Sequence, residues 1–240
     1  MAEKCSNSRR SNTPLPFIMV LLGVFVFPGC FSMSTMHTAR PIEKDANEIS
    51  FAPITVGLAA PDETIVDSDG DVISRTNVSL AMPSVEAQFR HGFTERFDMG
   101  VKLYLLGAGM DFNMLVLDKP GLAISIDPGF TATYFGAGDA RLFLGTLWLP
   151  VLFDVLTTEK ITVTVGPKAG LFFAGASGDD SDDGGDVYAE SMVDGMLGGM
   201  AGVKFQFTDR FYMMPEFDGV YEFRARYFWW TAALSFGFQI

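Results

Sequence analysis

The chain has 240 residues, of which 48% are apolar and 19% are charged, and its formal net charge is −12. This length suits one domain, and the acidic excess argues against nucleic acid as a partner. No apolar run reaches the roughly 18 residues that a membrane-spanning helix needs. The composition therefore predicts neither a nucleic-acid-binding protein nor a helical membrane protein.

The amino-terminal segment has the pattern of an export signal. Basic residues precede an apolar run over 17–27, which is the order of a signal peptide. The next residues, Phe27-Pro28-Gly29-Cys30, resemble the lipobox of bacterial lipoproteins. The resemblance implies a signal peptide of the lipoprotein type over 1–29, diacylglycerol on Cys30 and, because Phe31 follows, sorting to the outer membrane. Cleavage by the ordinary signal peptidase a few residues later is the alternative, and it would remove Cys30.

The segment that follows is expected to be a lipidated Cys30 and a polar periplasmic tether, together covering 30–47. It contains Arg40, Pro41 and Lys44, and no core is expected there. Removal of 1–29, which carries three basic residues and one acidic residue, leaves a net charge of −14. The other cysteine lies in the signal segment, so no disulfide is expected, and a closed hydrogen-bonded sheet must supply the stability.

The last stretch, 228–240, alternates strictly. Phe228, Trp230, Leu234, Phe236 and Phe238 share one parity, while small or polar residues occupy the other. Period two is the period of a β-strand. The stretch resembles the terminal strand of bacterial outer-membrane β-barrel proteins, whose apolar face contacts lipid.

Runs of about ten residues separated by turn residues fill 48–240, which suits tilted membrane strands. The resemblance and this pattern predict an all-β fold, a transmembrane antiparallel up-and-down β-barrel over 48–240 with about ten strands; eight and twelve remain alternatives. We expect the strands at 49–60, 83–92, 97–104, 109–117, 122–135, 141–155, 161–174, 192–207, 211–218 and 228–240.

A repeated turn fixes the expected ends of the barrel. Residues 93–99 recur as 207–213, with a looser copy at 156–161, and each copy is a short polar turn between apolar residues. The long loops, 61–80, 175–190 and 219–226, are expected at the opposite end. An even strand number places both termini at the short-turn end, which we expect to be periplasmic.

A soluble lipocalin-like barrel with its apolar face inward is the alternative fold. The polar parity of the strands mixes acids, bases, glycines and threonines, as a wet lumen does. A soluble surface would carry charge more densely than 19%. The pattern therefore favours the membrane barrel.

Charged residues on the inward parity define a predicted polar network in the lumen, with seven acids and four bases. In a small barrel such groups mostly pair and fill the interior; a narrow pore that prefers cations is the other interpretation. The predicted network is Glu86, Arg90, Asp98, Lys102, Asp111, Asp127, Lys168, Asp194, Lys204, Glu216 and Asp218.

Two further ligand hypotheses come from the sequence. The acidic loop Asp179, Asp180, Asp182, Asp183 and Asp186 could bind Ca²⁺ loosely, although it lacks a full EF-hand pattern and a solvated loop is the simpler interpretation. The strand at 141–155 is apolar on both parities. Part of the lumen could then be apolar, with Trp148 and Pro150 at a bulge where a hydrophobic ligand enters.

Enzymatic activity is not expected. Outer-membrane barrel enzymes use a His with Ser or carboxylate partners. His37 lies in the expected tether, and His91 lies on the outward parity. No other cofactor or confident metal site is predicted.

The sequence thus favours a non-enzymatic barrel lipoprotein of a Gram-negative outer membrane, structural or binding an unknown ligand through its loops. Its expected partners are outer-membrane lipids and the barrel-assembly and lipoprotein-sorting machineries. A narrow pore or a transporter for small or hydrophobic solutes is the alternative. A soluble carrier and a lipid-modifying enzyme rank lower.

Overall fold

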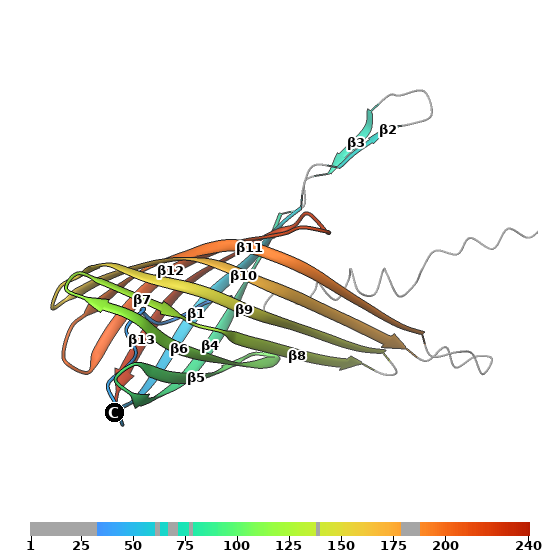
Figure 1. The fold of residues 1–240 in the computed structure, drawn as a ribbon. Coiled ribbons are helices and arrows are strands. Elements are labelled where there is room, and N and C mark those ends of the chain that lie inside the picture. The colour runs from blue at the N-terminus through green and yellow to red at the C-terminus, as the bar shows by residue number, and fades with distance from the viewer. Residues whose placement is uncertain (1–32, 61–62, 67–71, 77–78, 138–139, 179–187) are drawn as a thin grey trace, which may run out of the picture.

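The structure is a computed structural model, and it describes residues 33–60, 63–66, 72–76, 79–137, 140–178 and 188–240. These residues form a closed antiparallel barrel of ten strand positions, with a small separate hairpin beyond one end (Figure 1). The predicted fold class is confirmed. No helix in the described residues is long and apolar enough to span a membrane.

Eleven strands make the barrel, because β7 and β8 share one position. Both pair with β6 on one side and β9 on the other. Pairing of β1 with β13 closes the barrel. The strands are β1 (Asn47–Ala59), β4 (Ser79–Thr94), β5 (Phe97–Tyr104), β6 (Gly107–Lys119), β7 (Leu122–Ile126), β8 (Gly129–Ala137), β9 (Ala140–Thr157), β10 (Ile161–Gly178), β11 (Tyr188–Gln206), β12 (Phe211–Glu222) and β13 (Phe228–Gln239).

Each expected strand corresponds to one of these positions. The break between β7 and β8, at Asp127 and Pro128, was not expected within 122–135, and it follows from the missing N–H of proline. The hairpin of β2 (Glu63–Val66) and β3 (Val72–Thr76) lies in the expected long loop 61–80. Asp179, Asp180, Asp182, Asp183 and Asp186 lie outside the described residues.

The turns between β4 and β5, β6 and β7, β9 and β10, and β11 and β12 lie together at one end of the barrel, where the chain also ends (Figure 1). We call it the short-turn end, although the two-residue turn between β5 and β6 lies at the opposite end. The repeated motif forms the same turn twice, with the rings of Phe93 and Phe97 and those of Phe207 and Phe211 each 5.7 Å apart. In the second copy the hydroxyl of Thr208 accepts the N–H of Phe211 at 3.0 Å. Similar sequence thus produces similar structure at this end.

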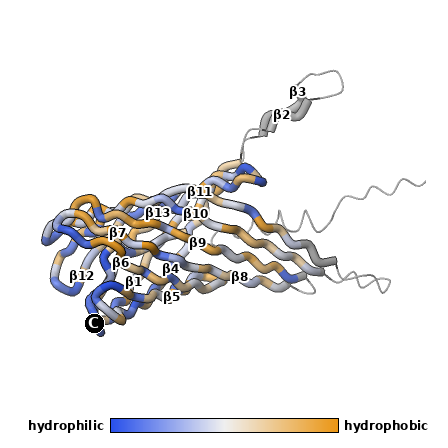
Figure 2. Tube along the Cα trace, viewed as in Figure 1, coloured by the Kyte–Doolittle hydropathy of each residue, from blue (hydrophilic) through white to orange (hydrophobic). Residues whose placement is uncertain are grey.

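The two faces of the wall differ as the alternation predicts. In β13, Phe228, Phe236 and Phe238 are exposed, whereas Thr231 and Ser235 are buried. Each of the ten strand positions carries at least one exposed large apolar side chain, and apolar residues recur along the strands in Figure 2. The inward-apolar alternative, a soluble lipocalin-like barrel, does not match these faces.

In the loop-side half of the lumen, apolar side chains from several strands pack together, as the pattern of β9 allowed, beside the buried carboxylates of Asp194 and Glu222. We call these packed apolar side chains the apolar cluster. Trp148 and Pro150 mark no bulge, since both pair regularly with β10; the register shift lies nearer the short turns, between Val163 and Thr164 of β10. The apolar cluster consists of Met33, Leu58, Leu142, Leu144, Phe172, Ala174, Met196, Val220 and Trp229.

The expected tether is instead part of the core. Residues 33–39 are buried inside the barrel, and residues 45–47 reach the short-turn end, where the N–H of Ile240 donates to the carbonyl of Asn47 at 2.8 Å. We call residues 33–46 the plug. The expectation failed because this segment buries its backbone against wall side chains and so needs no apolar face of its own.

Tyr212 passes over Gly237 to reach the lumen. A Cβ at Gly237 would lie 2.0 Å from Cζ of Tyr212, and the Tyr212 hydroxyl donates to Glu48 at 2.6 Å. The ring therefore occupies space that only glycine leaves free.

Gly237→Ala is expected to lower the free energy of unfolding by about 1–3 kcal/mol through overpacking. In a Tyr212→Ala background the same change should cost less than half as much, because the clash is gone. Urea unfolding of the four proteins measures this coupling. Additive costs would contradict the contact.

Candidate functional site: the plugged lumen

Carboxylates of the wall hold the plug by its backbone. Both oxygens of Glu216 accept N–H groups, from Thr35 at 2.5 Å and from Met36 at 2.9 Å. Asp154 in the same way accepts those of Ala39 at 3.0 Å and Arg40 at 3.3 Å. Hydrogen bonds from a carboxylate to buried N–H groups are charge-assisted and strong.

Asp98 adds a third such contact near the short turns, accepting the N–H of Ile42 at 2.8 Å. Three strands, β5, β9 and β12, therefore each contribute one carboxylate that binds the backbone of the plug.

Cationic and amide groups bind the carbonyls of the plug. Lys168 donates to Met33 O and Lys102 to Ser34 O, each at 2.6 Å. Asn113 donates to the carbonyl of Thr38 at 3.3 Å. Side chains from several strands of the wall therefore bind both the N–H groups and the carbonyls of the plug.

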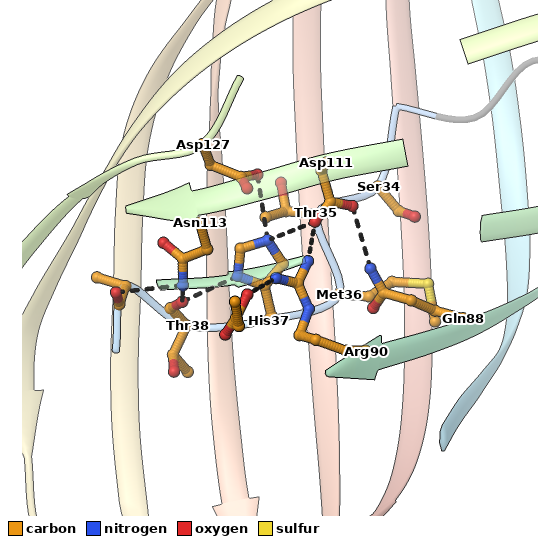
Figure 3. Close-up of polar contacts among 12 residues, drawn as sticks. Ser34, Thr35, Met36, His37, Thr38, Gln88, Arg90, Asp111, Asn113 and Asp127 are labelled. Atoms are coloured by element: carbon orange, nitrogen blue, oxygen red, sulfur yellow. Dashed lines mark hydrogen bonds and ion pairs between the residues drawn. The ribbon is translucent and has the colours of Figure 1, made fainter. Parts of the chain in front are cut away.

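His37 lies at the centre of this arrangement (Figure 3). Its Nδ1 is 2.9 Å from the carbonyl of Thr38, and its Nε2 is 3.1 Å from the Asp127 carboxylate. A carbonyl and an ionised carboxylate only accept hydrogen bonds. The Thr38 carbonyl therefore accepts a hydrogen bond from Nδ1, while Nε2 lies against the Asp127 carboxylate.

Arg90 forms the second charged centre of Figure 3. It is 1% exposed and ion-pairs with both Asp98 and Asp111. Gln88 donates to the other oxygen of Asp111 at 3.2 Å. A Cβ at Gly100 would lie 2.8 Å from Arg90 Nη2, so the glycine leaves room for the guanidinium.

His37, Asp111 and Asp127 have the spacing of a metal site, since their ligand atoms lie within 4.8 Å of one another. The same oxygens of Asp111, however, contact Arg90 and Lys102. A divalent cation there would face two fixed positive charges. The donor set therefore fits an internal ion-pair network better than a metal.

The remaining predicted lumen residues lie on the inner face but do not form one network. Glu86 accepts from the hydroxyl of Ser34 at 2.6 Å, and Asp218 pairs with Lys168. Asp194 binds the backbone of the last long loop instead, accepting the N–H of Arg224 at 2.8 Å. Lys204 is only half-buried and lies over the ring of Tyr212, 3.9 Å from its centroid.

Three residues of the plugged lumen were not among the predicted network. They are His37 inside the barrel, Asp154, and Asn113, which was expected on the inner face but not in the network. Asp154 lies in β9, whose sequence is apolar on both parities, so the sequence did not indicate which of its residues face inward. His91 does lie on the outer face, where its Nδ1 is 2.8 Å from the side-chain oxygen of Asn47. Cys30 lies outside the described residues.

The fit between plug and wall is close. A Cβ at Gly92 would lie 2.1 Å from the carbonyl oxygen of Glu43, so the glycine lets the plug approach. A cavity of about 30 Å³ beside Met33, Lys102 and Trp148 has room for only about two water molecules.

No family model matches the chain, and no curated protein matches it. Solved structures of bacterial outer-membrane β-barrels do. The outer membrane protease OmpT from Escherichia coli is 7% identical, with a TM-score of 0.47, over 86% of this chain and 100% of that chain. Ail, the attachment invasion locus protein of Yersinia pestis, is 13% identical, with a TM-score of 0.37, over 82% and 99%. Neisserial surface protein A is 12% identical, with a TM-score of 0.36, over 79% and 96%. Identities and TM-scores this low give no basis for assigning an activity.

Glu216→Gln is expected to lower the free energy of unfolding by about 1–3 kcal/mol, because one amide N–H₂ would then face a buried backbone N–H of the plug. Asp118→Asn is the matched control. It removes an exposed partner of Arg40, 3.1 Å away, and should cost less than about 1 kcal/mol. Equal costs in urea unfolding would contradict the role of Glu216.

Proposed function

We propose that the protein is a non-enzymatic β-barrel of a Gram-negative outer membrane, with a structural role or a binding role carried by its surface loops. One observation carries the proposal: the lumen is filled by the chain's own plug, held through its backbone by Glu216, Asp154 and Asp98. A barrel closed in this way does not serve as an open pore.

The outer face supports the membrane location. Exposed Phe51, Phe89, Leu147 and Phe217 lie on different strands, and a soluble protein rarely exposes so many large apolar side chains on all sides. We place the short-turn end, and with it the C-terminus and the start of β1, in the periplasm, as is usual for barrels of this type. Both termini were expected there, but the plug carries the amino-terminal end of the described chain into the loop-side half of the lumen.

The state of the two histidines supports a non-enzymatic role. His37, a residue of the plug, is buried against Asp127, and His91 contacts Asn47 on the outer face. In the described residues neither histidine lies beside a free nucleophile in an open cleft. Diacylglycerol on Cys30, loose Ca²⁺ binding by the 179–186 loop and the expected assembly partners belong to the same proposal.

The full-length protein is expected to give no discrete channel steps in a planar lipid bilayer. A variant with 33–42 replaced by a Gly-Ser segment of equal length should give steps that prefer cations, because acids outnumber bases on the inner face. Retention of the mobility shift on boiling is the folding control. Steps of the same size from the unaltered protein would favour the alternative, a narrow pore or transporter.

A further inference from the structure

The turn between β12 and β13 differs in charge from the turns at the short-turn end. The β12–β13 turn has exposed Arg224 and Arg226 and no exposed acid. Among the described residues, neither arginine side chain forms an ion pair or a hydrogen bond. Each of the four turns at the short-turn end instead carries an adjacent acid and base, all of them exposed, and is close to neutral: Glu95-Arg96, Asp118-Lys119, Glu159-Lys160 and Asp209-Arg210.

A buried carboxylate fixes the backbone that carries the two arginines. Asp194 of β11 accepts the N–H groups of Arg224 at 2.8 Å and of Ala225 at 3.2 Å. Across the turn, the N–H of Glu222 donates to the carbonyl of Tyr227 at 2.8 Å. The turn is therefore held from inside the barrel, while its arginine side chains remain exposed.

Arg226 occupies a backbone position that suits glycine better. Its φ is 58°, and this left-handed region is unfavourable for a residue with a side chain. In the turn between β6 and β7 the chain has Gly121 at a φ of 78°. A residue other than glycine in such a conformation is a reason to look for a function of its side chain.

The β12–β13 turn lies at the level expected for lipid headgroups. β12 has 12 residues, which at the usual rise and tilt place the turn about 30 Å from the short-turn end. The apolar band of such barrels is about 25 Å tall. With the short-turn end in the periplasm, Arg224 and Arg226 therefore lie just beyond the outer edge of that band.

Exposed apolar side chains adjoin the two arginines. Tyr221 pairs with Leu197 of β11 on one side and with Phe228 of β13 on the other. The ring of Tyr221 is also 6.0 Å from that of Phe223, and all four side chains are exposed. An apolar surface beside two cations matches a lipid, which has acyl chains next to a charged headgroup.

We propose that this surface binds a phosphorylated lipid of the outer leaflet. The guanidinium groups of Arg224 and Arg226 contact its phosphate, for which they are suited because each can donate two parallel hydrogen bonds. The acyl chains lie along Leu197, Tyr221 and Phe228. A soluble phosphate would gain nothing from these apolar side chains. The inference rests on the membrane location and orientation proposed above, and it names the partner of this end of the barrel.

The test is native mass spectrometry of the purified full-length protein in detergent micelles. The protein is titrated with a bis-phosphorylated glucosamine-disaccharide lipid, the glycolipid type of Gram-negative outer leaflets, or with its dephosphorylated form. We expect the phosphorylated form to bind at least about tenfold more tightly, because hydrogen bonds to charged groups are among the stronger ones. Changing both Arg224 and Arg226 to Gln should remove this preference.

Two further variants separate binding from folding. Arg226→Gly relieves the left-handed backbone, so it should leave the fold at least as stable and still lower the affinity for the phosphorylated lipid. Arg141→Gln is the matched control, since Arg141 is also exposed but lies near the loop-side end of β9. The 18 residues of β9 carry it about 15 Å further from the short-turn end than the β12–β13 turn. Its replacement should leave the affinity unchanged.

Equal affinity for the two lipids, or an unchanged preference after both arginines are replaced, would overturn the proposal. Displacement of the phosphorylated lipid by an equal concentration of inorganic phosphate would overturn it as well, because the site would then bind a soluble anion. In each case a retained mobility shift on boiling would show that the membrane barrel itself stands. Absence of that shift in the unaltered protein would show instead that the proposed function has failed.

Discussion

The structure depends on how buried carboxylates in a narrow barrel find hydrogen-bond donors. Three of them, Glu216, Asp154 and Asp98, accept backbone N–H groups of the plug. A buried charge without a partner is costly. Without the plug these carboxylates would depend on water or on the few lumenal cations. The plug and the wall therefore stabilise each other. The acidic side chains of the lumen bind the plug, and the plug in turn fills the lumen.

The rest of the architecture follows from this arrangement. Gly92 and Gly100 leave room for the plug and for the Arg90 guanidinium. The charged centre around His37 lies in the polar half of the lumen, while Met33 enters the apolar half. The lumen thus has two parts along its axis, one whose charged groups bind the backbone of the plug and one that is mainly apolar, and the amino-terminal end of the described chain lies in the second.

Most strands could be predicted because their sequences show period two, and this alternation alone places Asp98 and Lys102 on the inner face. The plug could not be predicted in the same way. The wall binds the plug through backbone groups, which every residue type has, so the sequence of 33–39 shows no pattern that marks it as buried. It was therefore interpreted as a polar tether. Two signals pointed to the plug: 31–39 carry no charged residue, unlike a solvated tether, and the inward acids exceed the bases. Asp154 was missed because β9 is apolar on both faces.

Hydrogen–deuterium exchange of the folded full-length protein measures whether the wall holds the plug. A plug held by wall carboxylates predicts that the amides of Thr35, Met36, Ala39 and Ile42 exchange as slowly as those of the neighbouring strands. Exchange of these amides within seconds, with the strands still protected, would show that the segment is a solvated tether and would contradict the account.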